Sequence, residues 1–167
     1  MQNKRTPAYA MALGGILAAL AVILMAMGTL IPVATYVCPV LCMMLLQTVL
    51  KTCGKRMAWA WYGTVMLLGL LLAPDKEAAA VFAFLGYYPI LKPRLDRCKA
   101  APLWKALLFN TVILVMYALL IHLLGMAHIA QEYAEMGIFL TTLMLFLGNV
   151  TFFLLDRLLG MKLKRKL

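Results

Sequence analysis

The sequence predicts an all-α membrane protein: one transmembrane domain over residues 1–167, folded as a bundle of six transmembrane helices with both termini in the cytoplasm. Composition is the first observation behind this prediction. Hydrophobic residues make up 65% of the chain and charged residues 13%, and the mean hydropathy is +0.93, far above that of a soluble domain. The second observation is that the apolar residues fall in six stretches with short connections: 8–28, 33–50, 57–73, 78–91, 103–125 and 137–159.

The basic residues give the expected orientation. With the N-terminus in the cytoplasm, 15 of the 16 Lys and Arg residues fall on the cytoplasmic side, and only Lys76 falls outside. Four of the six acidic residues fall on the outer side: Asp75, Glu77, Glu132 and Glu135. The formal net charge of +10 therefore reflects membrane topology, and we expect lipid but no nucleic acid as a partner.

The first stretch, 8–28, sorts small and large residues onto different faces. At 100° per residue, its small residues form two adjoining faces: Ala8, Ala12, Gly15, Ala19 and Ala26 on one, and Ala10, Gly14, Ala18, Ala21 and Gly28 on the other. Bulky residues gather on the remaining arc. Small residues let helix backbones approach closely in lipid. We therefore expect this helix to pack against other helices along two faces and to meet lipid on the third.

The second stretch, 33–50, follows a short outer turn at 29–32 and contains Pro39. A proline inside a membrane helix frees a carbonyl and kinks the helix, which leaves two possibilities, a structural kink or a kink that shapes a binding cavity. An inner loop is expected at 51–56, with Gly54 as the helix stop.

The third stretch, 57–73, carries aromatic residues at its inner end. Trp59, Trp61 and Tyr62 are expected to anchor the helix at the lipid headgroups, as amphipathic rings commonly do, rather than to form a ligand cage.

The fourth stretch, 78–91, is short for a membrane span. At 1.5 Å per residue it measures roughly 21 Å, against a hydrocarbon thickness of roughly 30 Å. Either Lys92 and Arg94 extend from inside its end to the headgroups, or the segment 86–89 departs from the helix and lengthens the rise, and we expect both.

The connection after the fourth stretch is the longest on the cytoplasmic side. Its basic segment 92–99 is expected to face solvent or lipid headgroups, and Pro93 and Pro102 are expected to break it. Such a surface either docks a partner or only sets topology.

The fifth and sixth stretches each carry one amide at comparable depth. Asn110 and Asn149 are expected to hydrogen-bond to each other, with lining of a substrate path as the alternative. Between the two stretches, the spacing of Ile129 and Tyr133 favours a short interfacial helix.

No pattern in the sequence indicates an enzyme. Metal-ligand spacings, phosphate-binding loops and nucleophile triads are absent from it, so we expect no catalytic residue, metal or cofactor. The four cysteines, Cys38, Cys42, Cys53 and Cys98, are expected to act as small hydrophobic residues without disulfides.

Polar and aromatic residues gather instead toward the outer side. They supply the few placed polar groups that a small-molecule site needs, although an outer aromatic belt explains the same pattern. The candidate substrate-binding residues are Tyr36, Glu77, Tyr117, His122, Glu132, Tyr133, Thr141 and Thr142.

The six short-looped spans, with Ala8-x-x-x-Ala12 and Ala10-x-x-x-Gly14-x-x-x-Ala18 in the first, resemble the substrate-binding S component of energy-coupling factor (ECF) transporters over nearly the whole chain. The resemblance implies a multi-pass protein of the bacterial cytoplasmic membrane that captures a small vitamin-like molecule outside. It also implies a transmembrane coupling subunit and two cytoplasmic ATPases as partners. One of two sets would form the docking face: Ala8, Ala12, Gly15 and Ala19, or Ala10, Gly14 and Ala18.

The residues leave a second function open. The chain can also be a small integral-membrane scaffold or assembly protein, in which the inner basic segments 92–99 and 162–166 hold a partner or anionic lipid.

Overall fold

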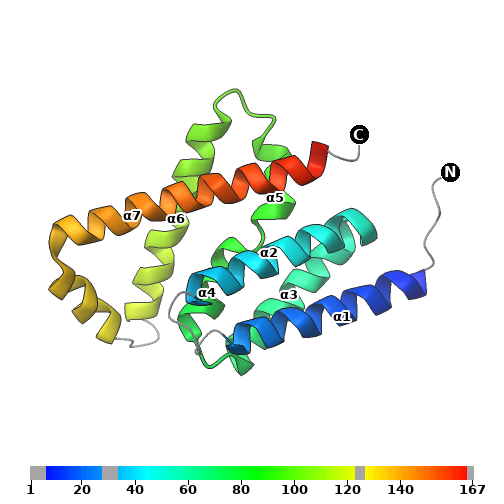
Figure 1. Cartoon of the computed structure of the whole chain (residues 1–167), viewed down its shortest axis with the longest axis horizontal. Coiled ribbons are helices and arrows are strands. Elements are labelled where there is room, and N and C mark those ends of the chain that lie inside the picture. The colour runs from blue at the N-terminus through cyan, green and yellow to red at the C-terminus, as the bar shows by residue number, and fades with distance from the viewer. Residues whose placement is uncertain (1–6, 28–33, 123–126, 165–167) are drawn as a thin grey trace. The chain divides into compact units, whose positions relative to one another are not determined.

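We describe the protein from a computed structural model that covers residues 7–27, 34–122 and 127–164, without the side chains of 7, 34, 120, 127–136 and 161–164. Within these residues the chain is helical and contains no strand (Figure 1). The helices are α1 (Pro7–Ala26), α2 (Ala34–Cys53), α3 (Lys55–Leu72), α4 (Lys76–Leu85), α5 (Tyr88–Leu95), α6 (Ala101–His122) and α7 (Ala127–Lys164). The outer turn expected at 29–32 lies outside the described residues.

Four described helices are long and apolar enough to cross a membrane, over Ala8–Ala26, Thr35–Cys53, Ala101–Leu119 and Gly137–Gly160. The prediction of an all-helical chain with membrane-compatible helices is thereby confirmed. The other two predicted spans correspond to α3 and to the consecutive short helices α4 and α5.

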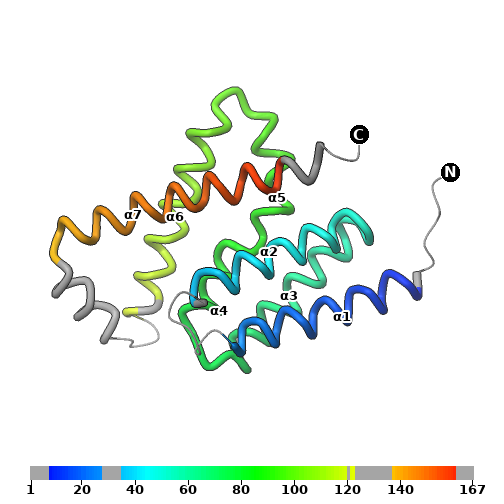
Figure 2. The backbone as a smooth tube through the Cα atoms, in the orientation of Figure 1, coloured from blue at the N-terminus to red at the C-terminus, as the bar shows by residue number. Residues whose placement is uncertain are grey.

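The helices cluster into two compact units, residues 1–96 and 97–167, which we describe separately. In the first unit α2 is the central helix, because it packs against α1, α3, α4 and α5. Figures 1 and 2 show α1, α2 and α3 running alongside one another. Side chains from each of these three helices, including Met25, Leu46 and Val65, are fully buried.

The turn between α2 and α3 is shorter than the loop predicted at 51–56. α2 continues to Cys53 and α3 begins at Lys55, so Gly54 alone separates them. Its φ of 85° lies in the left-handed region that favours glycine, and the expected helix stop at Gly54 is confirmed.

The fourth predicted span is two helices. Asp75 caps α4 by accepting a hydrogen bond from the Ala78 amide at 3.0 Å, and Gly86 and Tyr87 separate α4 from α5. The expected departure from helix at 86–89 is therefore limited to Gly86 and Tyr87, because Tyr88 and Pro89 already belong to α5. The fourth predicted span is therefore a helix interrupted between α4 and α5.

Two expectations about the basic connection at 92–99 are wrong. Pro93 lies inside α5 instead of ending it, and the helix continues for two residues beyond it although Pro93 offers no N–H to the Pro89 carbonyl. Lys92 is only 3% exposed, since its side chain turns inward along α5, where its ammonium lies 3.6 Å from the carboxylate of Asp96. The solvated basic segment therefore begins after Lys92.

The second unit is a pair of antiparallel helices. Three side-chain pairs cross between α6 and α7: Lys105 with Asp156, Phe109 with Phe152, and Asn110 with Asn149. α7 bends at Gly137, whose φ is 68°, so the sixth predicted span starts at this bend. The helical segment expected before it is present as the first part of α7.

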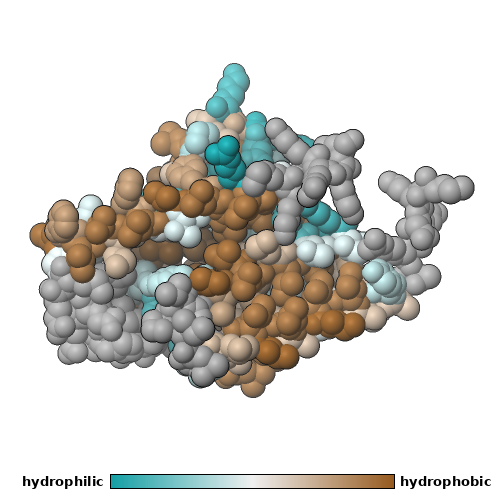
Figure 3. Space-filling view, in the orientation of Figure 1, coloured by the Kyte–Doolittle hydropathy of each residue, from teal (hydrophilic) through white to brown (hydrophobic). Residues whose placement is uncertain are grey.

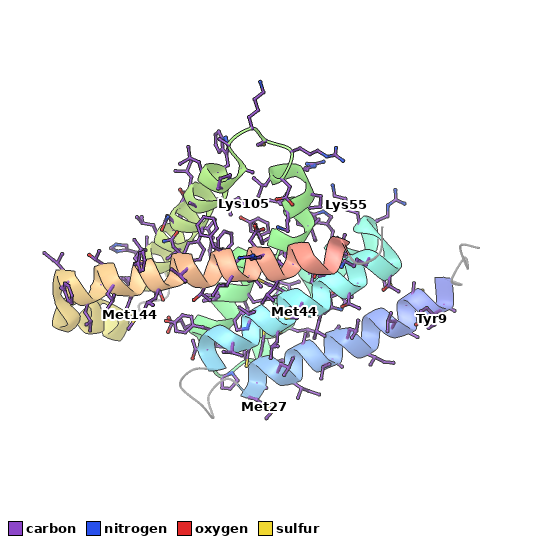
Figure 4. The ribbon with its side chains drawn as sticks, turned by 45° about the horizontal axis from the view of Figure 1, so that its top comes forward. Tyr9, Met27, Met44, Lys55, Lys105 and Met144 are labelled. Carbon is purple, nitrogen blue, oxygen red and sulfur yellow. The ribbon has the colours of Figure 1, made fainter. Side chains whose placement is uncertain are left out.

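Large apolar side chains cover much of the described surface. On α1 they include Met11, Ile16 and Ile23, and on α7 Ile138 and Phe139. Figure 3 shows hydrophobic atoms spread over one face of α1 and α2, and Figure 4 shows side chains projecting from α1 between the labelled Tyr9 and Met27. Exposed apolar area on this scale is rare on soluble monomers, whereas it is normal where lipid is the solvent.

Candidate functional site

A polar cluster joins the start of α2 to the start of α4, and we call Thr35, Tyr36, Asp75 and Glu77 the α2–α4 cluster. The Thr35 hydroxyl donates to Asp75 Oδ2 at 2.8 Å, and the Tyr36 hydroxyl donates to Glu77 Oε1 at 3.1 Å. Both carboxylates lie at the N-terminus of α4, where the helix dipole favours negative charge. Local sequence explains this geometry, since Pro74-Asp75 is a typical helix start.

The two carboxylates of the cluster have different surroundings. Asp75 uses one oxygen to cap α4 and the other to bind Thr35, so it fixes the position of α2 against α4. Glu77 lies beside Tyr36, whose ring is exposed. The intervening Lys76 donates from its ammonium to the Leu70 carbonyl at 2.9 Å, at the end of α3. Tyr36 is therefore an exposed member of the cluster, and Glu77 is partly exposed beside it.

Two of the eight predicted substrate-binding residues, Tyr36 and Glu77, are thus brought together. Tyr117, His122, Thr141 and Thr142 belong to the second unit, where His122 and Thr142 are exposed and Tyr117 is half-buried. The Thr141 and Thr142 hydroxyls donate to the carbonyls of Gly137 and Ile138 at 2.9 and 2.8 Å. The side chains of Glu132 and Tyr133 lie outside the described part of the chain.

The two small-residue faces of α1 have different surroundings in the structure. Ala10, Gly14, Ala18 and Ala21 form a packed face, with Gly14 and Ala21 buried. Three side chains from α2 and α3 donate to carbonyls on this face: Trp61 Nε1 to Gly14 at 3.0 Å, Cys42 Sγ to Ala21 at 3.5 Å and Cys53 Sγ to Ala10 at 3.6 Å. A Cβ at Gly14 would lie 3.2 Å from Met57 Cε.

The other face of α1 is open. Ala8, Ala12, Gly15, Ala19 and Ala26, which we call the open face, are all exposed. A Cβ built at Gly15 meets no described atom within 4 Å. Of the two sets of candidate docking residues, the set with Gly14 is therefore already packed against α2 and α3. The set with Gly15 is available to another helix.

The aromatic residues at the start of α3 do not all form an interfacial belt, which corrects the expectation. Trp59 is 42% exposed, as an anchor would be, whereas Trp61 is only 4% exposed. Trp61 and Tyr62 point inward because each carries a polar atom that satisfies a backbone carbonyl of a neighbouring helix. Trp61 donates to Gly14 and the Tyr62 hydroxyl donates to Ala83.

Asn110 and Asn149 form the predicted pair. Asn110 Nδ2 lies 3.1 Å from Asn149 Oδ1, and Asn149 Nδ2 lies 2.9 Å from Asn110 Oδ1, so each amide both donates and accepts. Each Nδ2 also donates to its own helix, at the carbonyls of Ala106 and Leu145. The amides therefore act as an interhelical clamp.

Sequence reasoning missed the pairing of Lys105 with Asp156. The Lys105 ammonium lies 2.9 Å from Asp156 Oδ2, and Lys105 is buried. The antiparallel register that pairs Asn110 with Asn149 also brings positions 105 and 156 together, so the predicted amide pair could have located this ion pair. The Thr35 and Asp75 pair had a local signal, the capping position of Asp75.

The described residues contain no group of three or more His, Cys, Asp or Glu able to hold a metal ion. Cys38, Cys42, Cys53 and Cys98, which all lie in the described part of the chain, form no disulfide. Comparison with known proteins adds no identification: no family model, curated protein or solved structure matches this chain.

Proposed function

We propose that this protein is the substrate-capturing membrane subunit of an ECF-type vitamin or micronutrient uptake transporter. It spans the bacterial cytoplasmic membrane six times with both termini in the cytoplasm, binds a small polar molecule near the outer surface, and catalyses no reaction. A transmembrane coupling subunit and cytoplasmic ATPases supply the energy. Neither a metal nor a cofactor takes part.

The open face of α1 is the observation that carries this proposal. The packed face already joins α1 to α2 and α3, so the protein's own unit makes no use of Ala8, Ala12, Gly15 and Ala19. Lipid contact requires no small residues, whereas a second membrane helix gains van der Waals contact from them. The open face is explained if the protein is a subunit that binds a second membrane protein through it.

The α2–α4 cluster supports the capture of a ligand. It offers a carboxylate at Glu77 and a phenol at Tyr36, on the side of unit 1 where the N-terminus of α4 lies. These groups suit a polar molecule with hydrogen-bond donors, because an ionised carboxylate only accepts. With Tyr36 exposed, such a molecule would reach the site from outside.

Docking on the open face is tested by copurification of the coupling subunit and ATPases from the native membrane with a tagged protein. Gly15→Leu should abolish copurification, because its side chain would fill the open face. Gly63→Leu on α3 is the matched control, since a Cβ there also meets no described atom within 4 Å. Equal copurification with both variants would contradict docking on this face.

Ligand capture is tested by native mass spectrometry of the protein purified from cells grown in rich medium. A retained small molecule is expected on the wild type and should be lost in Glu77→Gln and reduced in Tyr36→Phe. The control is Thr64→Val, because the exposed Thr64 hydroxyl bonds only to its own helix, at Ala60. Failure of every sample to retain a small molecule would count against capture.

The scaffold alternative draws on the exposed basic residues after Lys92. Arg94, Arg97 and Lys99 are all exposed, and they would suit an acidic partner or anionic lipid. In a scaffold, reversal of all three charges would abolish binding of the acidic partner or anionic lipid, and no transport subunits would copurify with the wild type. These two results together would favour the scaffold.

A further inference from the structure

The break between α4 and α5 is built differently from an ordinary helix end. The last helical bond of α4 runs from the Gly86 amide to the Phe82 carbonyl at 2.7 Å, and the first bonds of α5 run from Ile90 and Leu91 to the Tyr87 carbonyl at 3.0 and 3.4 Å. Pro89 has no N–H to offer the Leu85 carbonyl, and Pro93 offers none to Pro89. The backbone ladder is therefore interrupted in a segment that is itself buried.

One side chain from another helix holds this break. The Tyr62 hydroxyl on α3 donates to the carbonyl of Ala83, one turn before Tyr87. The Tyr62 ring also packs against Phe82 and Tyr87, at centroid distances of 5.8 and 6.2 Å. Tyr62 thus contacts α4 and the break simultaneously.

The packing around Gly86 leaves no room for a side chain. A Cβ there would lie 2.9 Å from Phe82 Cε2 and would also overlap the Phe82 carbonyl oxygen. Phe82 is itself fully buried and lies edge-on to Trp61. Glycine at the break is therefore required by close packing, and two prolines follow it.

We propose that the Gly86–Tyr87 break is a hinge between α4 and α5 and that the Tyr62 hydroxyl is its latch. α4 carries Asp75 and Glu77 of the α2–α4 cluster at its start, whereas α5 ends at the connection that leads into residues 97–167. The hinge lets α5 turn relative to α4, because α4 stays packed on α2 and α3 and its capping residue Asp75 is bonded to Thr35 of α2. Broken helices of this kind are tolerated in membranes where protein surrounds them.

Distances between spin labels test the hinge directly. Cysteines replace Lys76 and Arg94 at opposite ends of the broken span, in a full-length protein whose four native cysteines are changed to Ala. The matched pair replaces Lys55 and Leu71 on continuous α3. The hinge predicts a broader distance distribution for the first pair, and equal widths for the two pairs would overturn it.

Substitutions then test the latch. Tyr62→Phe keeps the ring but removes the donor to the part-buried Ala83 carbonyl. The 76/94 distribution should therefore broaden, and amide exchange over 85–91 should rise about tenfold, because that carbonyl loses its partner. Tyr87→Phe removes a hydroxyl from the same ring cluster and should change neither. Pro89→Ala supplies an amide for Leu85 and should narrow the distribution.

If Tyr62→Phe and Tyr87→Phe gave the same 76/94 distance distribution and the same amide exchange over 85–91, Tyr62 would not be the latch. Uniformly faster exchange over α1, α2 and α3 in Tyr62→Phe would overturn this assignment as well, because a general loss of stability would then explain the change. Both readouts are independent of ligand and partner. The hinge can therefore fail while the proposed transport function holds, and the reverse.

Discussion

At the scale of single residues, three pairs of side chains hold α6 against α7. Asn110 and Asn149 form a reciprocal pair of hydrogen bonds between α6 and α7. Beside this pair, Phe109 stacks on Phe152 at a centroid distance of 4.8 Å. Lys105 and Asp156 complete the same seam. In lipid such bonds matter because the apolar side chains between helices gain little from leaving the hydrocarbon.

Replacing Asn110 or Asn149 with Ala should lower the free energy of unfolding by roughly 0.6 to 2 kcal/mol, because each change removes the other amide's partner across the helices. The double variant should cost less than the sum of the two single variants. The free energy of unfolding in mixed micelles measures all three. Thr151→Ala is the control, since its exposed hydroxyl bonds only to Leu147 in its own helix. Strictly additive effects would show that the pair is not energetically coupled.

At the scale of elements, α1 has two neighbouring faces of similar composition and different use. Gly14 lies against Met57 and accepts from Trp61, whereas Gly15 borders open space. The same small residues therefore serve internal packing on one face and remain available on the other. A single-residue step around the helix, 100°, separates the two roles.

Gly14→Leu should destabilise the first unit by about 1 to 3 kcal/mol through overpacking against Met57, and it should also disturb the Trp61 bond. Gly15→Leu should leave the stability of the isolated protein near that of the wild type. Thermal unfolding in detergent compares the two, and tryptophan fluorescence reports on Trp61. Similar losses in both variants would mean that the open face is also packed within the protein.

At the scale of the whole molecule, charge and hydropathy agree on a membrane protein. The basic residues alternate with the apolar stretches, and the described helices expose large apolar side chains such as Leu71 and Leu114. The only basic residue expected outside, Lys76, bonds to the α3 backbone beside the α2–α4 cluster. The native thiol of Cys98 is exposed in the structure, and the orientation predicted from the basic residues puts it on the cytoplasmic side.

Labelling of intact cells with a membrane-impermeant maleimide should therefore modify a cysteine placed at Lys76 and leave Cys98 unmodified. After the cells are made permeable, Cys98 should react as well, while Cys38 and Cys42 stay protected because they are buried. The extent of labelling is read by mass spectrometry. Modification of Cys98 in intact cells would invert the proposed orientation.

Local physics made much of the architecture predictable. The helix stop at Gly54, the break after Leu85 and the pairing of Asn110 with Asn149 each follow from residue type and spacing. The errors concern residues whose direction depends on a neighbour. Trp61 and Tyr62 have the composition of an interfacial belt, and only the carbonyls of α1 and α4 draw them inside.

The sequence by itself determined that this is a helical, membrane-compatible chain with small residues on two faces of its first helix, because hydropathy, charge and periodicity are properties of the chain. Only the tertiary structure decided which face is used. α2 and α3 pack on the face of Gly14, since their donors Cys42, Cys53 and Trp61 meet carbonyls there. Adjacent faces of one helix look alike in sequence, and only a neighbouring helix distinguishes them.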